Sequence, residues 1–281
     1  MTVDRPVGDL LRVAPGSTVH LVDVDPRSTP GSDGDRAGAS ADLAERGKEL
    51  AVLQEQLYAQ ARVGSDRRVL VVLQGMDTSG KGGAVKRVAG LVNPAGLEVT
   101  GFGKPTPEER SHEFLWRVER ALPAPGRIGL FDRSHYEDVL IVRVHDLVPQ
   151  AEWETRYDRI NAWEAGLAEQ GVVLLKVMLH LSPQEQRTRL LARLDDPTKH
   201  WKVSPADLVE RGHWPAYQLA YQVLLERCSS DVAPWHVIPS DRKWYRDWAL
   251  AHLLLETLQG MDLSWPMPEL DIAGMRAALG A

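Results

Sequence analysis

Residues 69–83 read VLVVLQGMDTSGKGG, and this stretch decides the fold. Residues 69–73 form a short, continuous apolar run, which is typical of a strand buried in a parallel sheet. The segment from Gly75 to Lys81 fits the pattern G-x-x-x-x-G-K and leads into a predicted helix over residues 81–91. Strand, motif and helix therefore follow one another in the order that a phosphate-binding loop (P-loop) requires.

The residues of this loop can surround phosphate oxygens with positive charge. Glycines let the backbone turn tightly so that successive N–H groups point inward, and the helix N-terminus adds a partial positive charge. Lys81 adds a full one. The candidate phosphate-binding residues of the loop are Gly75, Thr78, Ser79, Gly80, Lys81, Gly82 and Gly83. A glycine-rich turn without a ligand is the weaker interpretation, because strand and helix are both in place.

Gly82 stands where nucleoside triphosphatases usually have the Ser or Thr that binds Mg²⁺. A carboxylate would have to replace this hydroxyl, and Asp77 lies within the loop itself. A carboxylate that faces bound phosphate is repelled unless a divalent cation lies between them. Asp77 therefore predicts a bound metal ion, Mg²⁺ or Mn²⁺, unless its side chain faces away and caps the turn.

A second acidic position follows the predicted strand over residues 128–131. Asp132 comes directly after this apolar run, a pattern that holds Mg²⁺ in P-loop enzymes. The carboxyl ends of parallel strands meet at one edge of a sheet, so Asp77 and Asp132 should lie close together. Arg133 can bind transferring phosphates with both of its terminal nitrogens. His135 is better explained as a hydrogen-bonded residue than as a base, since phosphoryl transfer depends mainly on positioning and charge neutralisation.

The rest of the chain alternates between apolar strands and helices. Further strands are predicted over residues 97–102, 172–181 (a run interrupted by Lys176) and 235–238, and helices from residue 43 onward and over 106–122, 153–169, 182–194, 205–228 and 241–258. This alternation predicts an α/β three-layer domain with a central parallel sheet. We expect a flexible arm and linker over residues 1–42, since residues 26–42 are rich in Pro, Gly, Ser and Asp. The domain would span residues 43–265 and a tail residues 266–281.

Basic residues flank the two motifs and suit a chain of phosphates better than a single triphosphate. They are Lys86, Arg87, Lys104, Arg117 and Arg143. Residues 193–212 are polar and interrupted, which favours a lid that closes over the donor phosphates and excludes water. The candidate lid cations are Arg189, Arg193, Lys199 and Lys202. For any one of these residues, the alternative is a solvated surface charge.

Composition limits the class of protein. The chain has 281 residues, 43% of them hydrophobic, which is enough for one large domain. Its single cysteine, Cys228, excludes a disulfide scaffold. The N-terminus does not resemble a signal peptide, and no run approaches the about 20 apolar residues that cross a bilayer, so we expect a cytoplasmic protein without a membrane partner. A net charge of −6 argues against a nucleic-acid partner, although a locally basic channel could bind a smaller polyanion.

Five segments together resemble the polyphosphate kinase 2 family. They read GMDTSGKGG (75–83), GFGKPTPEERSHEFLWRV (101–118), FDRSHYEDVLIVRV (131–144), RLDDPTKHWKVSPADL (193–208) and APWHVIPSDRKWYRDW (233–248). The resemblance extends over residues 43–258 and implies a thymidylate-kinase-like P-loop fold. It also implies Mg²⁺-dependent transfer of the terminal phosphoryl group of inorganic polyphosphate to a nucleotide, by a homotetramer or homodimer.

The resemblance assigns roles to individual residues. Asp77 and Asp132 match the two essential aspartates, and Lys81 and Arg133 match the phosphate-binding pair. Arg193 resembles a lid arginine, and Lys104 with the nearby basic residues would line the polyphosphate channel. The sequence HYED over residues 135–138 is similar to the class III subgroup, which accepts nucleoside mono- and diphosphates such as AMP, ADP, GMP and GDP. It implies that Glu137 lies near the acceptor phosphate and the metal.

Two other functions share part of this pattern. An ATP-dependent kinase of the thymidylate or adenylate kinase type has the same fold and lid, but it should have Ser or Thr at position 82. A non-catalytic P-loop module would bind nucleotide for regulation or assembly. The second carboxylate, the arginines of the lid and the flanking lysines favour an enzyme, in which the nucleotide attacks the end of polyphosphate in line and without a covalent intermediate.

Overall fold

The structure, a computed structural model, describes residues 5–280. Its strands are β1 (Arg68–Gln74), β2 (Leu97–Gly101), β3 (Ile128–Asp132), β4 (Val172–His180) and β5 (Trp235–Pro239). They form one sheet in the order β2-β3-β1-β4-β5, in which all neighbouring pairs are parallel. The predicted α/β fold with a central parallel sheet is therefore confirmed.

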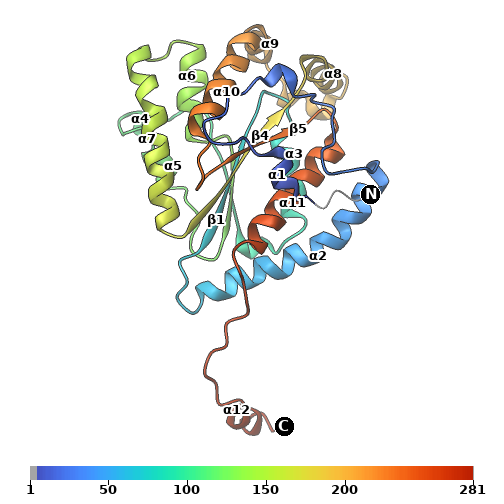
Figure 1. Ribbon diagram of the computed structural model, residues 1–281, viewed down its shortest axis with the longest axis vertical. Helices are drawn as coiled ribbons and strands as arrows, with labels where there is room; N and C mark the ends of the chain where they lie inside the picture. The colour runs from blue at the N-terminus through green and yellow to red at the C-terminus, as the bar shows by residue number, and fades with distance from the viewer. Residues whose placement is uncertain (1–4, 281) are drawn as a thin grey trace.

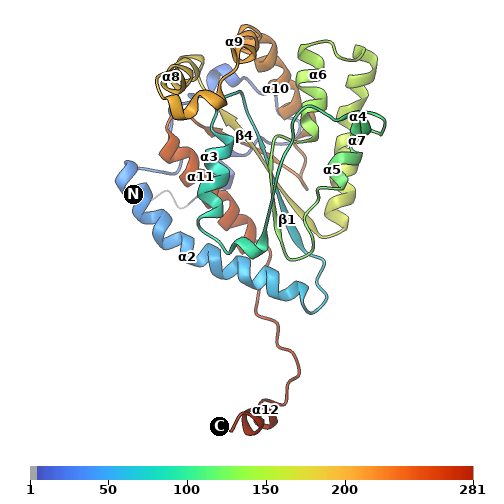
Figure 2. The same cartoon turned by 180° about the vertical axis from the view of Figure 1, so that it is seen from behind.

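Helices cover both faces of this sheet (Figures 1 and 2). The α-helices are α1 (Val7–Leu11), α2 (Arg36–Ala61), α3 (Lys81–Ala89), α4 (Pro107–Arg110), α5 (Trp116–Glu119), α6 (Ile141–Val144), α7 (Gln150–Glu169), α8 (Pro183–Leu194), α9 (Pro205–Gly212), α10 (Trp214–Cys228), α11 (Lys243–Gln259) and α12 (Ile272–Ala278). The 3-10 turns are η1 (Leu21–Asp23), η2 (Pro94–Gly96), η3 (His135–Val139) and η4 (Pro197–Lys202).

Each face of the sheet has its own apolar core. The first core contains Val69, Val71 and Leu73 of β1, which pack with α1, α2, α3 and α11. The second core contains Leu70 and Val72, which pack with η3, α6, α7 and α10. Successive side chains of a strand point to opposite faces, so one apolar run supplies both cores. This explains why the run over residues 69–73 is continuous rather than alternating.

The N-terminal region is more ordered than predicted. Helix α2 begins at Arg36, and Asp35 caps it by accepting hydrogen bonds from the N–H groups of Ala37 and Gly38 at 3.0 Å. The prediction of a linker over residues 36–42 is therefore wrong, because this cap outweighs the Gly- and Ser-rich composition. Upstream, the N–H group of Val7 donates to Glu256 of α11 at 2.8 Å, which ties α1 to the domain.

Two predicted helices are interrupted in the structure. The capping box of Thr106 and Glu109 is present, but the helix it opens is only α4, and α5 starts separately after the Glu113 side chain accepts from the N–H group of Leu115. The predicted helix over residues 205–228 divides at His213 into α9 and α10. Pro215 lies in the first turn of α10, where a missing N–H group is tolerated. In the interior of one continuous helix over residues 205–228, the same proline would remove a hydrogen bond and clash with the preceding turn.

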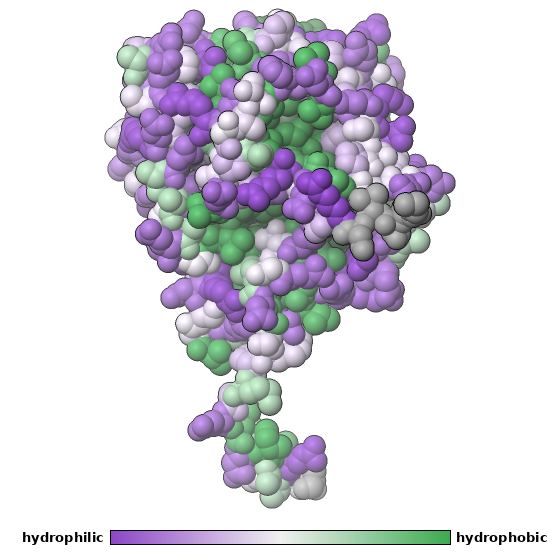
Figure 3. All heavy atoms as spheres, in the orientation of Figure 1, coloured by the Kyte–Doolittle hydropathy of each residue, from purple (hydrophilic) through white to green (hydrophobic). Residues whose placement is uncertain are grey.

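The C-terminal tail extends away from the domain and carries α12 (Figure 1). Figure 3 shows hydrophobic residues on this projecting segment. They include Met267, Leu270, Ile272 and Leu279, each more than half exposed. Among the described residues, no helix combines the length and hydrophobicity that a bilayer span needs.

Helix α2 should stabilise the domain through its buried leucines. Leu57 is 0% exposed in the first core, whereas Val52 on the same helix is 46% exposed. We predict that Leu57→Ala lowers the free energy of unfolding by about 2–5 kcal/mol, because it removes packed methyl groups and leaves a cavity. The control Val52→Ala should change it by less than about 0.5 kcal/mol. Urea denaturation measures both, and equal losses would contradict the packing of α2.

Candidate active site

The register of the sheet brings the two sequence motifs together. Strands β1 and β3 pair so that Leu73 lies opposite Asp132. The N–H group of Arg133 then donates to the carbonyl of Leu73 at 3.0 Å. The loop from Gly75 and the segment from Asp132 therefore leave the same edge of the sheet side by side, as predicted from their positions after strands.

The P-loop is tightly folded around its lysine. Gly75 and Gly80 have φ angles of 150° and 103°, which favour glycine, and Thr78 also has a positive φ of 66°. The ammonium group of Lys81 is buried and donates to the carbonyl of Gly75 at 2.7 Å and to that of Met76 at 3.5 Å. Burial lowers the pKa of Lys81, while the nearby carboxylates oppose this effect.

Arg133 lies between two carboxylates. Its Nη2 is 2.7 Å from Oδ1 of Asp77, and its Nη1 is 3.8 Å from Oε2 of Glu137. Burial disfavours its charge, but Glu137 and Asp77 outweigh burial and raise the pKa of Arg133. The φ angle of Arg133 is 67°, a left-handed conformation that non-glycine residues adopt rarely and often at functional sites.

Glu137 and Asp132 complete the acidic part of the site. Glu137 is partly buried, and burial raises its pKa, although Arg133 and Lys81 oppose the shift. Asp132 faces the first turn of α3, because a Cβ atom at Gly82 would lie 3.7 Å from Oδ2 of Asp132. Gly82, the position at which a Ser or Thr hydroxyl usually binds the metal, therefore lies next to the carboxylate of Asp132.

Protein side chains alone do not form a complete metal cage. Within residues 5–280, no three His, Cys, Asp or Glu side chains are grouped so as to hold a metal ion. Mg²⁺ in phosphoryl-transfer enzymes is commonly held by one or two carboxylates together with substrate phosphates. Asp77 and Asp132, which both act on the charge of Lys81, fit such an incomplete site.

Two buried arginines hold the P-loop from behind, and neither was predicted to do so. Arg189 of α8 donates to the carbonyls of Thr78 and Ser79 at 2.9 and 3.0 Å. Its other terminal nitrogen donates to Ser240 and Asp241, so the prediction of Arg189 as a lid cation is wrong. Arg246 of α11 also reaches the carbonyl of Ser79, at 3.4 Å.

A sequence signal for Arg246 was present. Arg246 lies on the same helical face as Leu250 and Leu253, which are buried in the first core. A charged residue on an apolar helical face has to find a buried partner. Arg246 finds the loop and Asp247, whose Oδ1 is 2.6 Å from its Nη2.

The other predicted basic residues lie in different surroundings. Lys86 and Arg87 are exposed in the last turn of α3. Lys104 is exposed and Arg117 is buried, and both line a cavity beside the loop. Arg143 instead packs over the ring of Trp153 and donates to Tyr157, and it does not line this cavity.

The predicted lid cations make local contacts. Arg193 donates to the carbonyl of Lys202 at 3.1 Å, and Lys199 pairs with Asp196 at 2.6 Å. Trp201 is 80% exposed and lies beneath the ammonium group of Lys202. All of these contacts lie within residues 193–202, at the end of α8 and in η4, and none of them involves the P-loop. Binding of a phosphate chain by these cations therefore stays a prediction.

A cavity of about 900 Å³ opens next to Arg133 and Glu137. Phe102 and Phe114 form apolar parts of its wall. Its basic residues are Lys104, Arg110, Arg117, Arg133, Arg156 and Arg159. Of these, Arg110, Arg156 and Arg159 were not predicted, although Arg156 lies on the apolar face of α7.

Asp138 is held between two arginines in this cavity. Its carboxylate is 3.2 Å from Nη1 of Arg156 and 3.8 Å from Nη2 of Arg117. Burial raises the pKa of Asp138 to about 6, and the two guanidinium groups limit this rise. The cavity thus combines apolar walls with fixed charges of both signs, as sites for polar small molecules do.

Comparison with known proteins identifies the family of the chain. The family model described as Polyphosphate kinase 2 (PPK2) matches residues 34–265. The chain belongs to the polyphosphate kinase 2 family. The resemblance of the five sequence segments is therefore confirmed, and so is the expectation of an enzyme of the kinase type.

Curated relatives support this family membership. The chain is 45% identical to an AMP/ADP-polyphosphate phosphotransferase of Meiothermus ruber, over 92% of this chain and 95% of the relative. It is 42% identical to an ADP-polyphosphate phosphotransferase of Rhodopseudomonas palustris, over 78% of each chain.

A solved structure agrees with the fold. The crystal structure of polyphosphate kinase 2 from Arthrobacter aurescens TC1 is similar with a TM-score of 0.95 and 49% sequence identity. The similarity extends over 98% of this chain and 97% of the other. The predicted P-loop kinase fold is therefore confirmed.

The close approach of Arg246 and the backbone conformation at Gly80 should make any side chain at this position destabilising. A Cβ atom at Gly80 would lie 1.7 Å from Nη1 of Arg246, and its φ of 103° disfavours any side chain. We predict that Gly80→Ala lowers the free energy of unfolding by about 1–3 kcal/mol from backbone strain alone. Gly82→Ala is the matched control, because it meets no atom closer than 3.7 Å and alanine favours helix. Thermal unfolding distinguishes them, and a fully stable Gly80→Ala would contradict the close packing and the strained backbone at Gly80.

Proposed function

We propose that this member of the polyphosphate kinase 2 family transfers the terminal phosphoryl group of inorganic polyphosphate to AMP or ADP, with GMP and GDP as further candidate acceptors. The observation that carries the proposal is the position of Arg133. It pairs with Asp77 of the P-loop on one side and with Glu137 at the cavity on the other. A guanidinium at this junction can bind the transferring group while it moves from donor to acceptor.

The donor would bind on the P-loop side. Loop N–H groups and the α3 N-terminus favour phosphate oxygens there. The ammonium group of Lys81 would exchange the carbonyls of Gly75 and Met76 for the phosphate. Residues 193–212 would then form the lid that excludes water from the phosphoanhydride, with Arg193, Lys199 and Lys202 released from their local contacts.

The acceptor nucleotide would bind in the cavity. Its volume of about 900 Å³ lies within the range of small-molecule sites and is ample for a nucleotide. Phe102 and Phe114 can contact the base, and Arg117 and Arg156 can neutralise its phosphates. The shared wall at Arg133 and Glu137 would hold the acceptor oxygen close to the donor.

A divalent metal ion, Mg²⁺ or Mn²⁺, fits the acidic residues of the site. Asp77 and Asp132 would hold it together with phosphate oxygens, and Glu137 would join them from the acceptor side. When bound, such an ion neutralises charge between carboxylates and phosphates. The Asp132 carboxylate beside Gly82 takes the place of the usual hydroxyl.

The residues of the chain would act on charge and position rather than through a covalent intermediate. Lys81, Arg133 and the loop N–H groups would stabilise the charge on the transferring phosphoryl group. Arg133 and Glu137 would orient the attacking oxygen in line with the phosphorus–oxygen bond that breaks. We further propose that the protein acts in the cytoplasm and as a homo-oligomer, a tetramer or dimer.

The donor can be tested directly against an ATP-dependent kinase. We predict AMP phosphorylation with polyphosphate as sole donor and a much lower rate with ATP alone. Lys81→Ala and Asp77→Asn should each lower kcat by roughly 10²–10³-fold, because each removes charge stabilisation at the transferring group. Chromatographic product analysis measures this, with Lys48→Ala on α2 as the control. Faster turnover with ATP than with polyphosphate would contradict the proposal.

The acceptor site is tested through Phe114. The guanidinium carbons of Arg156 and Arg159 lie 5.1 and 4.9 Å from the centre of its ring. We predict that Phe114→Ala raises the KM for AMP and ADP by roughly 10–100-fold, since it removes apolar contact worth about 1.5–3 kcal/mol and frees both arginines. The KM for polyphosphate should stay unchanged. Val63→Ala, an exposed position outside the cavity, is the control, and an equal rise in both KM values would refute the assignment.

A further inference from the structure

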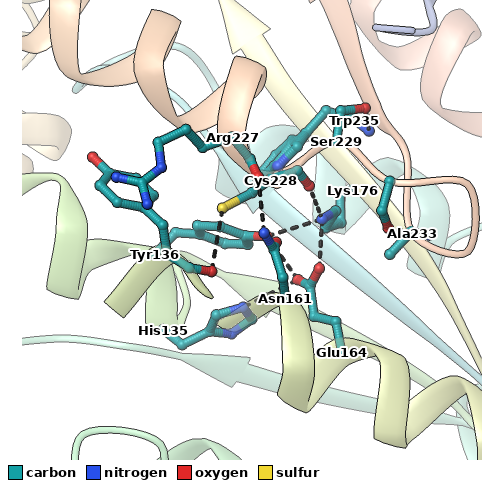
Figure 4. A network of polar contacts seen from close by, with 12 residues as sticks. His135, Tyr136, Asn161, Glu164, Lys176, Arg227, Cys228, Ser229, Ala233 and Trp235 are labelled. Carbon is teal, nitrogen blue, oxygen red and sulfur yellow. Dashed lines mark hydrogen bonds and ion pairs between the residues drawn. The ribbon is translucent and has the colours of Figure 1, made fainter. Parts of the chain in front are cut away.

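A buried polar network lies behind the active site, in the second core of the sheet (Figure 4). Glu164 of α7 and Lys176 of β4 are both 0% exposed, and their Oε2 and Nζ atoms are 2.5 Å apart. Neither residue lines the cavity or contacts the P-loop. A buried ion pair away from the reacting groups needs an explanation, because apolar residues would fill the same space as stably.

The hydrogen bonds of the pair lead to the η3 turn. Oε1 of Glu164 accepts from the hydroxyl of Tyr136 at 2.8 Å and lies 3.3 Å from Nε2 of His135. The Lys176 ammonium donates to the Tyr136 hydroxyl at 2.9 Å and to the carbonyl of Cys228 at 2.6 Å. All three of its donors are therefore used.

His135 donates to the pair rather than carrying a charge of its own. The Glu164 carboxylate can only accept a hydrogen bond, so Nε2 of His135 donates to it across 3.3 Å. Burial lowers the pKa of His135, which disfavours a charged ring. Its other nitrogen, Nδ1, is buried without a hydrogen-bond partner. Trp163 packs against the ring of His135 edge-on, with centroids 4.8 Å apart, and Trp235 packs in the same way against Tyr136 at 4.9 Å. Both rings are thus fixed in orientation.

In the chain, His135 and Tyr136 lie between Arg133 and Glu137. The side chains of His135 and Tyr136 point into the core, whereas those of Arg133 and Glu137 line the cavity. Only Ser134 separates Arg133 from this turn, and its hydroxyl caps it by accepting from the N–H group of Tyr136 at 3.2 Å. A rotation of the short η3 turn would move the anchored rings and the two cavity residues together.

We propose that Glu164 and Lys176 are positioning residues for phosphoryl transfer, which hold η3 so that Arg133 and Glu137 face the transferring group. This inference rests on the proposed function. The left-handed backbone at Arg133 needs such support, because its strain would relax if the turn were free. The ion pair thereby fixes one orientation of the turn, which an apolar core of the same volume would not do.

The first test removes one oxygen atom. Tyr136→Phe deletes the hydroxyl that joins Glu164 to Lys176, and we expect kcat to fall by roughly 10–100-fold while both KM values stay within about twofold. Tyr157→Phe is the matched control, because Tyr157 is also 0% exposed in the same core but has its hydroxyl 3.4 Å from Arg143 and no bond to η3. The control should retain wild-type kcat.

The second test neutralises the pair. The double variant Glu164→Gln and Lys176→Met keeps similar volumes without leaving a lone buried charge, and we expect the same loss of kcat in a folded protein. Wild-type kcat in either folded variant would overturn the inference, as would an equal loss in Tyr157→Phe. Should neither variant fold while Tyr157→Phe does, the pair is a folding element and the inference fails.

The test of the positioning role does not require that polyphosphate is the donor. Each variant is measured against the wild type with whichever donor the wild type uses. Absence of polyphosphate-dependent turnover in the wild type would count against the proposed function alone. A kcat loss confined to the Glu164, Lys176 and Tyr136 variants would still support the positioning role.

Discussion

The P-loop is held in shape by side chains that satisfy its carbonyl oxygens. Each carbonyl from residue 75 to residue 79 accepts a bond from a side chain. The donors are Lys81 to Gly75 and Met76, Gln186 to Asp77, Arg189 to Thr78 and Ser79, and Arg246 to Ser79. The shape of the loop therefore depends on the packing of helices α3, α8 and α11 at one edge of the sheet.

This arrangement separates structural cations from those available to a ligand. Arg189 and Arg246 are paired with Glu185 and Asp247, so their charges are largely compensated within the protein. Lys81 holds only its own loop carbonyls, and Arg133 sits between carboxylates that a cation or a phosphate can reorganise. The electrostatic attraction for phosphate thus comes from Lys81 and Arg133, whereas Arg189 and Arg246 hold the loop in place.

Sequence reasoning could identify the residues that follow strands, because the parallel sheet brings strand ends together. Asp77, Asp132 and Arg133 were found in this way, and their proximity followed from the register of β1 and β3. It missed Arg156 and Arg246, although both lie on apolar helical faces, because the pattern of a helix does not name the partner that a buried charge will bind. Breaks such as that at His213 were missed because local turns interrupted continuous helical patterns.

Cys228 has a practical consequence. It is the only cysteine of the chain, it is 0% exposed, and burial raises the pKa of its thiol to about 12. The reactive thiolate is therefore almost absent at neutral pH, and reagents cannot reach the sulfur in the folded protein. A cysteine introduced on α9 would consequently be the single site for a fluorescent label, so that movement of the proposed lid could be followed without first removing the native thiol.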